Sequence, residues 1–331
     1  MNASRPPGVS DVTRPPQPPA AKSSLSMLRH VEVPDPLRAA KRRVPRPVKR
    51  VVRRAARRYG ERTADHRALP DFLIIGTKRG GTTSVWNWLV RHPNVSPMFP
   101  SLQQIKSPHY FDIHFGRGER WYRSHFPSRA ALERAAQRTG IRPLTGEASP
   151  YYLFHPLAPE RVQHTIPKAR LIVLLRNPVD RAYSNYWERR GSDAECLPTF
   201  EAAIDAEEER LRGETERILT DPGYYSQHHD WHSYLARGRY VEQLSRWLDR
   251  FGRDQLLIMP FENLRSNAND AYREVQEFLS LPVVEPPRLT HHNKLPVPPM
   301  SVETRSRLVE YFRPYNARLT ELLGTPFDWD S

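Results

Sequence analysis

The chain has 331 residues, of which 38% are hydrophobic and 10% aromatic, and its formal net charge is +14. This composition can fill a sizeable core, which excludes disorder throughout the chain, and the single cysteine excludes a disulfide framework or a four-cysteine zinc module. No apolar run is long enough to span a bilayer and no N-terminal apolar segment is typical of a secretory signal, so we expect a cytoplasmic protein.

The positive charge is concentrated in residues 1–70, which hold 17 Lys and Arg against 5 Asp and Glu, together with 11 of the 33 prolines. A segment so charged, so rich in proline and so poor in aromatic residues cannot bury enough apolar surface to offset its chain entropy. We therefore predict disorder from residue 1 to about residue 45. Residues 1–70 would form a basic tail, and residues 71–331 would form one globular domain.

One part of the tail, residues 47–59, has the pattern of an amphipathic helix. Apolar residues recur from Val48 to Tyr59 at spacings of three and four, and arginines occupy the opposite face. We expect Gly60 to end this helix. Docking on the chain's own domain is the simplest expectation, although the arginines also suit an anionic membrane surface or an acidic partner. Nucleic acid is the less favoured partner.

From Asp71 onward the composition is that of a globular domain. Apolar runs predict buried strands at residues 72–75, 170–175 and 255–259. Helical periodicity predicts helices at residues 82–91, 129–138, 179 onward, 199–213, 239–251, 266–279 and 301–323. Buried strands that alternate with helices indicate a parallel sheet with helices on both faces. The predicted fold class is therefore α/β.

The first predicted strand runs into a glycine-rich loop and then into a helix. Glycines let the backbone approach a ligand, and the N–H groups and dipole of a helix N-terminus attract an anion. Gly76 and Gly81 have the spacing of the nucleotide-binding P-loop, but the lysine lies inside the loop, at Lys78, instead of after the second glycine. The loop is P-loop-like and suits a phosphate-like group, but it is not a Walker A motif.

The second predicted strand ends in Arg176, where a nucleotide triphosphatase would commonly place an aspartate for Mg²⁺. A guanidinium at this point, with Ser184 in the following helix, suits a second phosphate, whereas a plain salt bridge is the alternative for Arg176. Two anion sites at one edge of the sheet indicate a nucleotide that carries two phosphates.

At these positions the chain resembles the sulfotransferases that use 3′-phosphoadenosine 5′-phosphosulfate (PAPS). Residues 77–84 are similar to their 5′-phosphosulfate loop, and Arg176 with Ser184 is similar to their 3′-phosphate motif. Residues 146–156 and the C-terminal loop around residue 293 resemble segments of bacterial members and of the heparan sulfate branch. The resemblance covers about residues 71–328.

The resemblance implies transfer of a sulfuryl group from PAPS to a hydroxyl or amine of a carbohydrate or other small acceptor, without a metal. It implies that Lys78 contacts the bridging oxygen and the leaving phosphate. Lys294 would close over the nucleotide. The residues implied to bind the nucleotide are Thr77, Lys78, Arg79, Gly80, Gly81, Thr82, Thr83, Ser84, Arg176, Ser184, Asn293 and Lys294.

The catalytic base is the point at which this sequence departs from its relatives. In the heparan sulfate branch a glutamate precedes a phenylalanine by four residues, and here Ser107 takes its place. A serine hydroxyl has too high a pKa to accept a proton near pH 7. His109 titrates near neutrality and resembles the histidine that follows a Lys-Thr pair in cytosolic sulfotransferases, but it shares a face with Ser107 only if the segment is extended. Glu147 is the rival base.

The residues that would bind the acceptor are less clearly marked in the sequence than those that would bind the nucleotide. Residues 109–126 and 224–234 are rich in aromatic and histidine side chains, which suit a sugar or aromatic acceptor but also form ordinary half-buried loops. His228, His229 and His232 have helical spacing, yet without a cysteine or a clear carboxylate partner we favour a cleft or surface location over a metal site.

Two other functions stay open at this point. A P-loop nucleotide kinase would need a lysine beside Thr82 and an acid for Mg²⁺. A binding module would use the basic tail to hold its partner against a non-catalytic scaffold. Deletion of residues 1–70 would abolish the function of such a module, whereas an enzyme would largely keep its activity.

Overall fold

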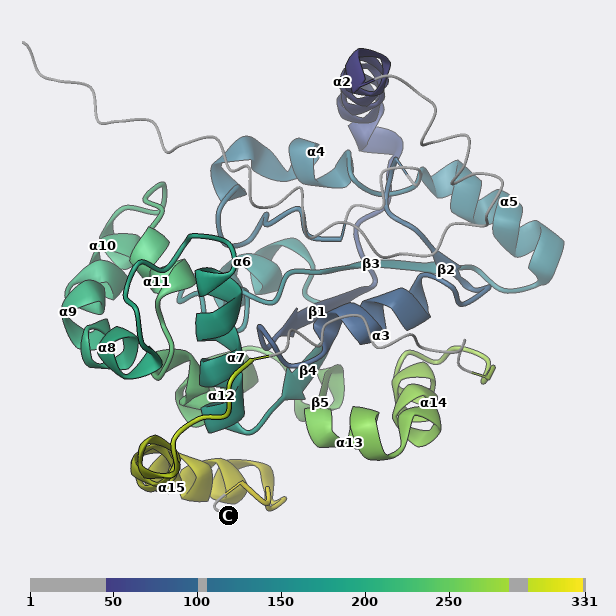
Figure 1. Cartoon of the computed structure of the whole chain (residues 1–331). Helices are drawn as coiled ribbons and strands as arrows, with labels where there is room; N and C mark the ends of the chain where they lie inside the picture. The colour runs from purple at the N-terminus through teal and green to yellow at the C-terminus, as the bar shows by residue number, and fades with distance from the viewer. Residues whose placement is uncertain (1–45, 101–105, 286–296, 330–331) are drawn as a thin grey trace, which may run out of the picture. The chain divides into compact units, whose positions relative to one another are not determined.

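The computed structural model describes residues 46–100, 106–285 and 297–329. The disorder predicted up to about residue 45, and the sites predicted at Asn293 and Lys294, lie outside these ranges. Within them the chain forms a five-stranded sheet in the order β2-β3-β1-β4-β5 (Figure 1), and every paired strand is parallel. The strands are β1 Phe72–Gly76, β2 Val95–Ser96, β3 Leu144–Ala148, β4 Arg170–Leu175 and β5 Leu256–Pro260. The predicted α/β fold is confirmed.

The two central strands are the ones with the plainest apolar runs. Every residue of β1 is buried, and so is every residue of β4 after Arg170. Leu73 of β1 lies opposite Leu171 on one side and Glu147 of β3 on the other. Because parallel strands end at the same edge, the loops after β1, β3 and β4 come together at the carboxyl edge of the sheet.

Helices surround the sheet (Figure 1), and α15 packs against α12 and α7. The helices that follow β1 are α3 Thr82–Leu89, α4 Gly118–Arg123, α5 Arg129–Thr139, α6 Ala158–Thr165, α7 Pro178–Arg190, α8 Phe200–Asp205, α9 Glu207–Leu211, α10 Glu214–Thr220, α11 Gln227–Trp231, α12 Tyr240–Leu248, α13 Phe261–Ser266, α14 Ala268–Phe278 and α15 Val302–Leu323. Single 3₁₀ turns occupy η2 Ala64–His66, η4 Phe115–Arg117, η5 Ala236–Gly238 and η6 Arg253–Gln255.

One of the predicted helices is interrupted. The segment 199–213 contains α8 and α9, which are separated at Ala206, and Gly213, with a φ of 72°, precedes α10. The helix predicted at 266–279 is confirmed as α14, which begins where the side chain of Asn267 accepts a hydrogen bond from the N–H of Asp270. Apolar periodicity does not reveal the break at Ala206.

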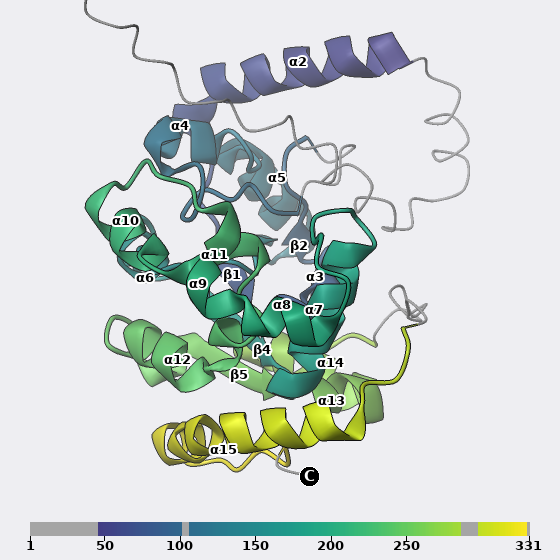
Figure 2. The ribbon, with the colours of Figure 1, turned by 60° about the vertical axis from the view of Figure 1, so that its left-hand side comes forward.

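The amphipathic helix exists, but the expectation about its end is wrong, and the expected docking on the chain's own domain is seen only at its C-terminal end. α2 spans Arg46–Arg62 and continues through Gly60, where a Cβ would lie 2.8 Å from the carbonyl oxygen of Ser124. Gly60 therefore serves close packing instead of ending the helix. The helix is docked only in part: Val51 is 66% exposed, whereas the ring of Tyr59, although that residue is 58% exposed, lies 6.0 Å from the ring of Phe99. Figure 2 shows that α2 meets the neighbouring α4 and η2 at its C-terminal end.

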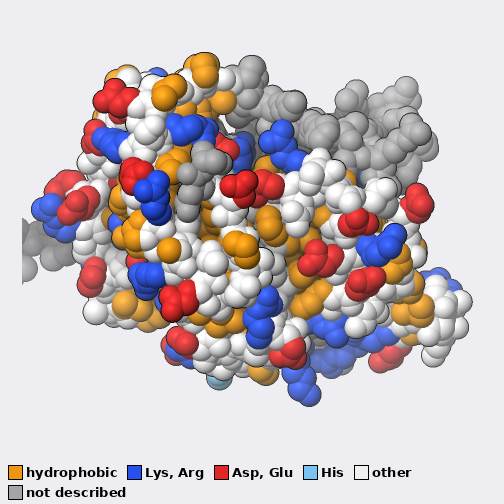
Figure 3. Space-filling model, turned by 90° about the horizontal axis from the view of Figure 1, so that it is seen from below, with side chains coloured by type: hydrophobic (Ala, Val, Ile, Leu, Met, Phe, Trp, Pro, Cys, Tyr) orange, Lys and Arg blue, Asp and Glu red, His pale blue; other side chains and the backbone are white. Residues whose placement is uncertain are grey.

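Charge elsewhere is mixed. On the face seen in Figure 3, Lys and Arg side chains alternate with Asp and Glu side chains. The strongly basic composition of α2, with Glu61 as its one acidic residue, contrasts with this face. Among the residues that the structure describes, no helix is long and apolar enough to cross a membrane.

Candidate active site

The glycine-rich loop lies between β1 and α3 and is pressed against β4. The N–H of Thr77 donates to the carbonyl oxygen of Leu174 (2.8 Å), and the N–H of Gly80 donates to that of Thr77 (2.9 Å). A Cβ on Gly80 would lie 2.7 Å from the Leu174 oxygen. Gly81 has a φ of 89° and immediately precedes α3. Glycine is thus required at both positions, and the loop leads directly into the N-terminus of a helix.

A lysine that the sequence analysis did not assign lies at the start of α3. The Nζ of Lys106 donates to the hydroxyl of Thr83 (2.9 Å) and is 3.4 Å from that of Thr82. Burial lowers the pKa of Lys106 to about 8, while the nearby Glu188 carboxylate opposes this shift. The first N–H groups of a helix have no partner within it, so Lys106 adds a positive charge to an existing anion site.

The two predicted phosphate sites meet at Arg79. Its Nε donates to the hydroxyl of Ser184 (2.9 Å) in α7, and its carbonyl oxygen accepts from Nη1 of Arg176 (3.2 Å) at the end of β4. Arg79 has a φ of 69°, which turns this part of the loop toward α7. The structure therefore brings Arg79, Arg176 and Ser184 together, as the order of β1 and β4 in the sheet requires.

The remaining loop residues take less specific positions. Thr77 is buried, and Lys78 and Ser84 are half-buried. The N–H of Gly80, which was expected to face the ligand, is used by the Thr77 carbonyl. A ligand in the loop therefore has the N–H groups of Gly81, Thr82 and Thr83 available, since the N–H of Ser84 already donates to the Gly81 carbonyl oxygen (2.9 Å).

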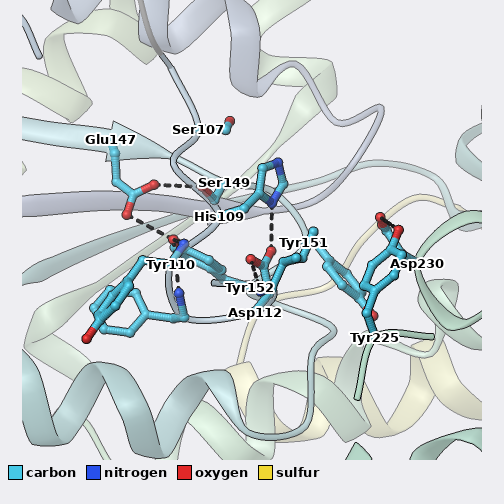
Figure 4. Close-up of polar contacts among 12 residues, drawn as sticks. Ser107, His109, Tyr110, Asp112, Glu147, Ser149, Tyr151, Tyr152, Tyr225 and Asp230 are labelled. Atoms are coloured by element: carbon cyan, nitrogen blue, oxygen red, sulfur yellow. Dashed lines mark hydrogen bonds and ion pairs between the residues drawn. The ribbon is translucent and has the colours of Figure 1, made fainter. Parts of the chain in front are cut away.

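The segment that contains His109 is a turn and not a strand, so the extended geometry that would place His109 on the same face as Ser107 is not present. His109 has a φ of 52°, and the N–H of His114 donates back to its carbonyl oxygen (2.8 Å). Within this turn, Nδ1 of His109 is 2.8 Å from Oδ2 of Asp112 (Figure 4). Ser107, which stands where relatives have a glutamate, donates its hydroxyl to the carbonyl oxygen of Ala148.

The His109–Asp112 pair is partly open to solvent. The side chain of His109 is 33% exposed, whereas that of Asp112 is fully buried. Burial alone would lower the pKa of His109, but the Asp112 carboxylate, with smaller contributions from Asp230 and Glu147, raises it to about 9. The contact with Nδ1 leaves Nε2 as the ring nitrogen that can meet an acceptor.

Glu147 is enclosed. It is fully buried on β3, and its oxygens accept hydrogen bonds from Tyr122 (2.6 Å), Ser149 (2.6 Å) and Tyr152 (3.0 Å). Burial raises the pKa of Glu147 to about 7, although these three donors act in the opposite direction. Its carboxylate joins α4, through Tyr122, to the turn that follows β3, and an acceptor cannot reach it without displacing one of these hydroxyl groups.

The first of the two aromatic segments is divided between core and surface. Tyr110 stacks on Tyr122 with ring centroids 4.4 Å apart, and Phe111 and Phe126 are fully buried. These rings fix the turn that carries His109. The aromatic and histidine side chains of this segment that stay partly open to an acceptor are those of His109, His114, Phe115, Trp121 and His125.

The second aromatic segment forms another wall near His109. In α11, Asp230 accepts a hydrogen bond from the hydroxyl of Tyr225 (3.0 Å; Figure 4), and His229 lies 2.7 Å from the hydroxyl of Tyr151. His228 and His232 contact each other through their Nδ1 atoms (3.0 Å). Across the described ranges, no group of three or more His, Cys, Asp or Glu side chains could hold a metal ion.

This architecture defines a class: a P-loop-like α/β protein with its anion site at the carboxyl edge of the sheet. The family model described as "Sulfotransferase domain" matches residues 69–307, and the chain belongs to that family. It is therefore a sulfotransferase of the EC 2.8.2 class, an enzyme that transfers a sulfuryl group. The nucleotide kinase and the non-catalytic scaffold considered above are set aside by this membership.

Known proteins resemble the chain over most of its length. The membrane-associated sulfotransferase kil1 of Dictyostelium discoideum is 27% identical over 80% of this chain and 67% of its own length. The human bifunctional heparan sulfate N-deacetylase/N-sulfotransferase 2 is 30% identical over 80% of this chain, which spans only 30% of that protein. A sulfotransferase from Alicyclobacillus acidocaldarius has a similar solved structure, with a TM-score of 0.59 and 28% identity over 80% of this chain and 100% of its own.

Proposed function

We propose that this sulfotransferase uses PAPS as its donor and a hydroxyl or amine of a carbohydrate or other small molecule as its acceptor. The observation that carries the proposal is the meeting of Arg79, Arg176 and Ser184 beside the glycine-rich loop. Two guanidinium groups and a hydroxyl suit a phosphate, and the start of α3 with Lys106 suits a second anion. Calorimetry with 3′-phosphoadenosine 5′-phosphate, detailed at the end of the Discussion, tests it.

The hydrogen-bond donors and positive charges of the site fit a nucleotide that has anionic groups at both its 3′ and 5′ positions. Arg176 and Ser184 would hold the 3′-phosphate, and Arg79 lies where it can reach the same group. Lys78, Lys106 and the first N–H groups of α3 would hold the 5′-phosphosulfate. Asn293 and Lys294 remain candidates for closing over the nucleotide.

When bound, PAPS supplies the sulfuryl group, whose sulfur–oxygen bond to phosphate breaks as a bond to the acceptor oxygen or nitrogen forms. The protein must then stabilise the charge on the leaving phosphate and remove the acceptor's proton. Positive side chains at the start of α3 serve the first need. His109 would take the proton on Nε2, since its Nδ1 is held by Asp112.

His109 is the better candidate for the base than Glu147. Its ring is partly exposed at the edge of a turn, whereas Glu147 is fully buried and already accepts three hydrogen bonds. Ser107 is occupied by the Ala148 carbonyl. We assign Glu147 to holding the turn in place through Tyr122 and Tyr152.

Lys78→Ala should lower kcat more than it raises the KM for PAPS. A lysine that contacts the bridging oxygen gains most of its interaction as charge develops on the leaving phosphate, so its loss is felt mainly in the transition state. Steady-state kinetics measure both constants, with the exposed Lys168→Ala as the matched control. A normal kcat with only a raised KM would reduce Lys78 to a binding residue.

We also propose that α2 attaches the protein peripherally to an anionic membrane surface, in preference to an acidic protein partner. Val51, Val52 and Tyr59 are exposed on a helix whose exposed arginines include Arg54, Arg57 and Arg58. An exposed amphipathic helix with a basic face suits the interface of a bilayer that contains anionic lipid. The kil1 relative is named as membrane-associated.

Substitution of Arg54, Arg57 and Arg58 by Ala should weaken binding to vesicles of phosphatidylserine and phosphatidylcholine by at least about 10-fold. Each basic residue near an anionic surface contributes about 1 kcal/mol. Vesicle sedimentation measures the effect, and the same three-residue substitution on α15, at Arg307, Arg313 and Arg318, is the control. Equal binding by all three proteins would contradict membrane attachment through α2.

A further inference from the structure

Glu188 presents a buried carboxylate oxygen that nothing in the described chain satisfies. It stands on α7, one helical turn after Ser184, and its side chain is only 10% exposed. One oxygen lies 3.5 Å from Nη1 of Arg79. The other, Oε2, is buried and has no hydrogen-bond partner among the described residues. An unsatisfied buried acceptor is costly, so such an atom indicates a missing ligand.

Glu188 also lies between the anion site proposed for the sulfuryl donor and the acceptor side of the active site. Burial raises the pKa of its carboxyl group, and the charges that act on it are those of Arg79, Asp230, Arg237 and Lys106. Arg79 and Lys106 belong to the anion site, whereas Asp230 is on α11 and Arg237 follows it in η5. The carboxylate therefore faces the region where the donor's sulfuryl group and the acceptor must meet.

The neighbouring acid on the acceptor side is already engaged. Asp230 accepts from Tyr225 (3.0 Å) and lies 3.6 Å from Nη2 of Arg237. Once anionic groups of the donor occupy Arg79 and Lys106, Glu188 loses its nearest positive neighbours to them. Loss of these neighbours raises the pKa of its carboxyl group further, so an acceptor that donates a hydrogen bond or carries an ammonium group is needed to keep Glu188 ionised.

We propose that Glu188 binds the acceptor, with Oε2 accepting a hydrogen bond from its hydroxyl or ammonium group, and that this carboxylate selects neutral or amine-bearing acceptors over anionic ones. The inference rests on the proposed function, since it needs the donor beside Arg79. Repulsion of like charge is an effective means of excluding a wrong substrate. The acceptor proposed for this chain therefore differs in charge from heparan sulfate, the polyanion that appears in the name of the human relative.

Three size-matched acceptors test this selectivity: the methyl glycosides of glucose, glucosamine and glucuronic acid. The unmodified chain should transfer sulfuryl groups to the first two with a kcat/KM at least about 10-fold higher than to the third. Glu188→Gln keeps the shape but removes the charge, so it should reduce this preference at least about fivefold. Glu188→Ala should raise the acceptor KM about 10-fold or more, while the KM for PAPS should not rise, because this variant also frees Arg79 for the nucleotide.

A binding measurement gives a second readout that needs no acceptor. Glu188 competes with the nucleotide for Arg79, so Glu188→Gln should bind 3′-phosphoadenosine 5′-phosphate about 3- to 10-fold more tightly in calorimetry. Glu216→Gln, an exposed change on α10, is the control for both experiments. Weaker nucleotide binding by Glu188→Gln would show a structural role and overturn the inference.

The outcomes separate this inference from the proposed function. Failure of the unmodified chain to bind 3′-phosphoadenosine 5′-phosphate contradicts the proposed function itself. A chain that binds the nucleotide but transfers only to the glucuronic acid glycoside, or to none of the three, overturns the proposed acceptor class. If Glu188→Gln keeps the selectivity of the unmodified chain, the role assigned to Glu188 is wrong, whereas the proposed function is unaffected.

Discussion

His109→Ala should lose about 10²- to 10⁴-fold in turnover, the range expected for removal of a general base, while its affinity for the nucleotide stays unchanged. His109 lies at a partly exposed edge with Nε2 available, and within the described part of the chain its side chain is held by Asp112 and not by the glycine-rich loop, so its loss should not disturb donor binding. Glu147→Gln is the comparison. If only the glutamine variant is inactive and folded, Glu147 is the base and the assignment to His109 is wrong.

The pH dependence of kcat/KM distinguishes the two bases independently. A base acts in its deprotonated form, so activity rises with pH through the base's own pKa. For His109, whose pKa is raised to about 9 chiefly by Asp112, the rise should extend to about pH 9; for Glu147 it should end near pH 7. Asp112→Asn removes the carboxylate, so the rise should move to lower pH. A profile that Asp112→Asn leaves in place would contradict His109 as the base.

Arg176→Ala should weaken binding of 3′-phosphoadenosine 5′-phosphate by about 10- to 100-fold, because a charge-assisted hydrogen bond contributes about 1.5–3 kcal/mol. Arg176 also donates to the Arg79 carbonyl, so its loss frees the part of the loop that faces Ser184. Calorimetry measures the affinity, and the exposed Arg265→Ala on α13 is the control. Binding as tight as that of the unmodified chain would return Arg176 to a plain structural role.

The sequence predicted the parts of the fold that carry a strong local signal. β1, β4 and β5 are apolar runs, and the glycine-rich loop lies where the turn after β1 was expected. β2 and β3 were missed, since β2 has two residues and β3, with the sequence Leu-Thr-Gly-Glu-Ala, has no apolar run. The carboxylate of β3 is buried because three hydroxyl groups surround it, which no local pattern shows.

The part of the site that could be predicted from the sequence is the part formed by residues at the ends of strands. Arg176 and the loop meet because β1 and β4 are neighbours, whereas the contact of Arg79 with Ser184 depends on a left-handed residue within the loop. Lys106 was missed because it reaches the start of α3 from a segment distant in the sequence, and Glu188 was missed because the pattern that singled out Ser184 did not extend along α7. One signal was present for Glu188: it follows Ser184 by four residues, so both lie on the same face of a helix.

The most direct test is calorimetric titration of the chain with 3′-phosphoadenosine 5′-phosphate in the presence of EDTA, set against ATP with Mg²⁺. The convergence of Arg79, Arg176 and Ser184 beside the loop favours a ligand with separate 3′ and 5′ anionic groups. Binding of 3′-phosphoadenosine 5′-phosphate should therefore persist without metal and be at least about 10-fold tighter than binding of ATP with Mg²⁺. Loss of binding in EDTA, or a preference for ATP with Mg²⁺, would contradict PAPS as the donor.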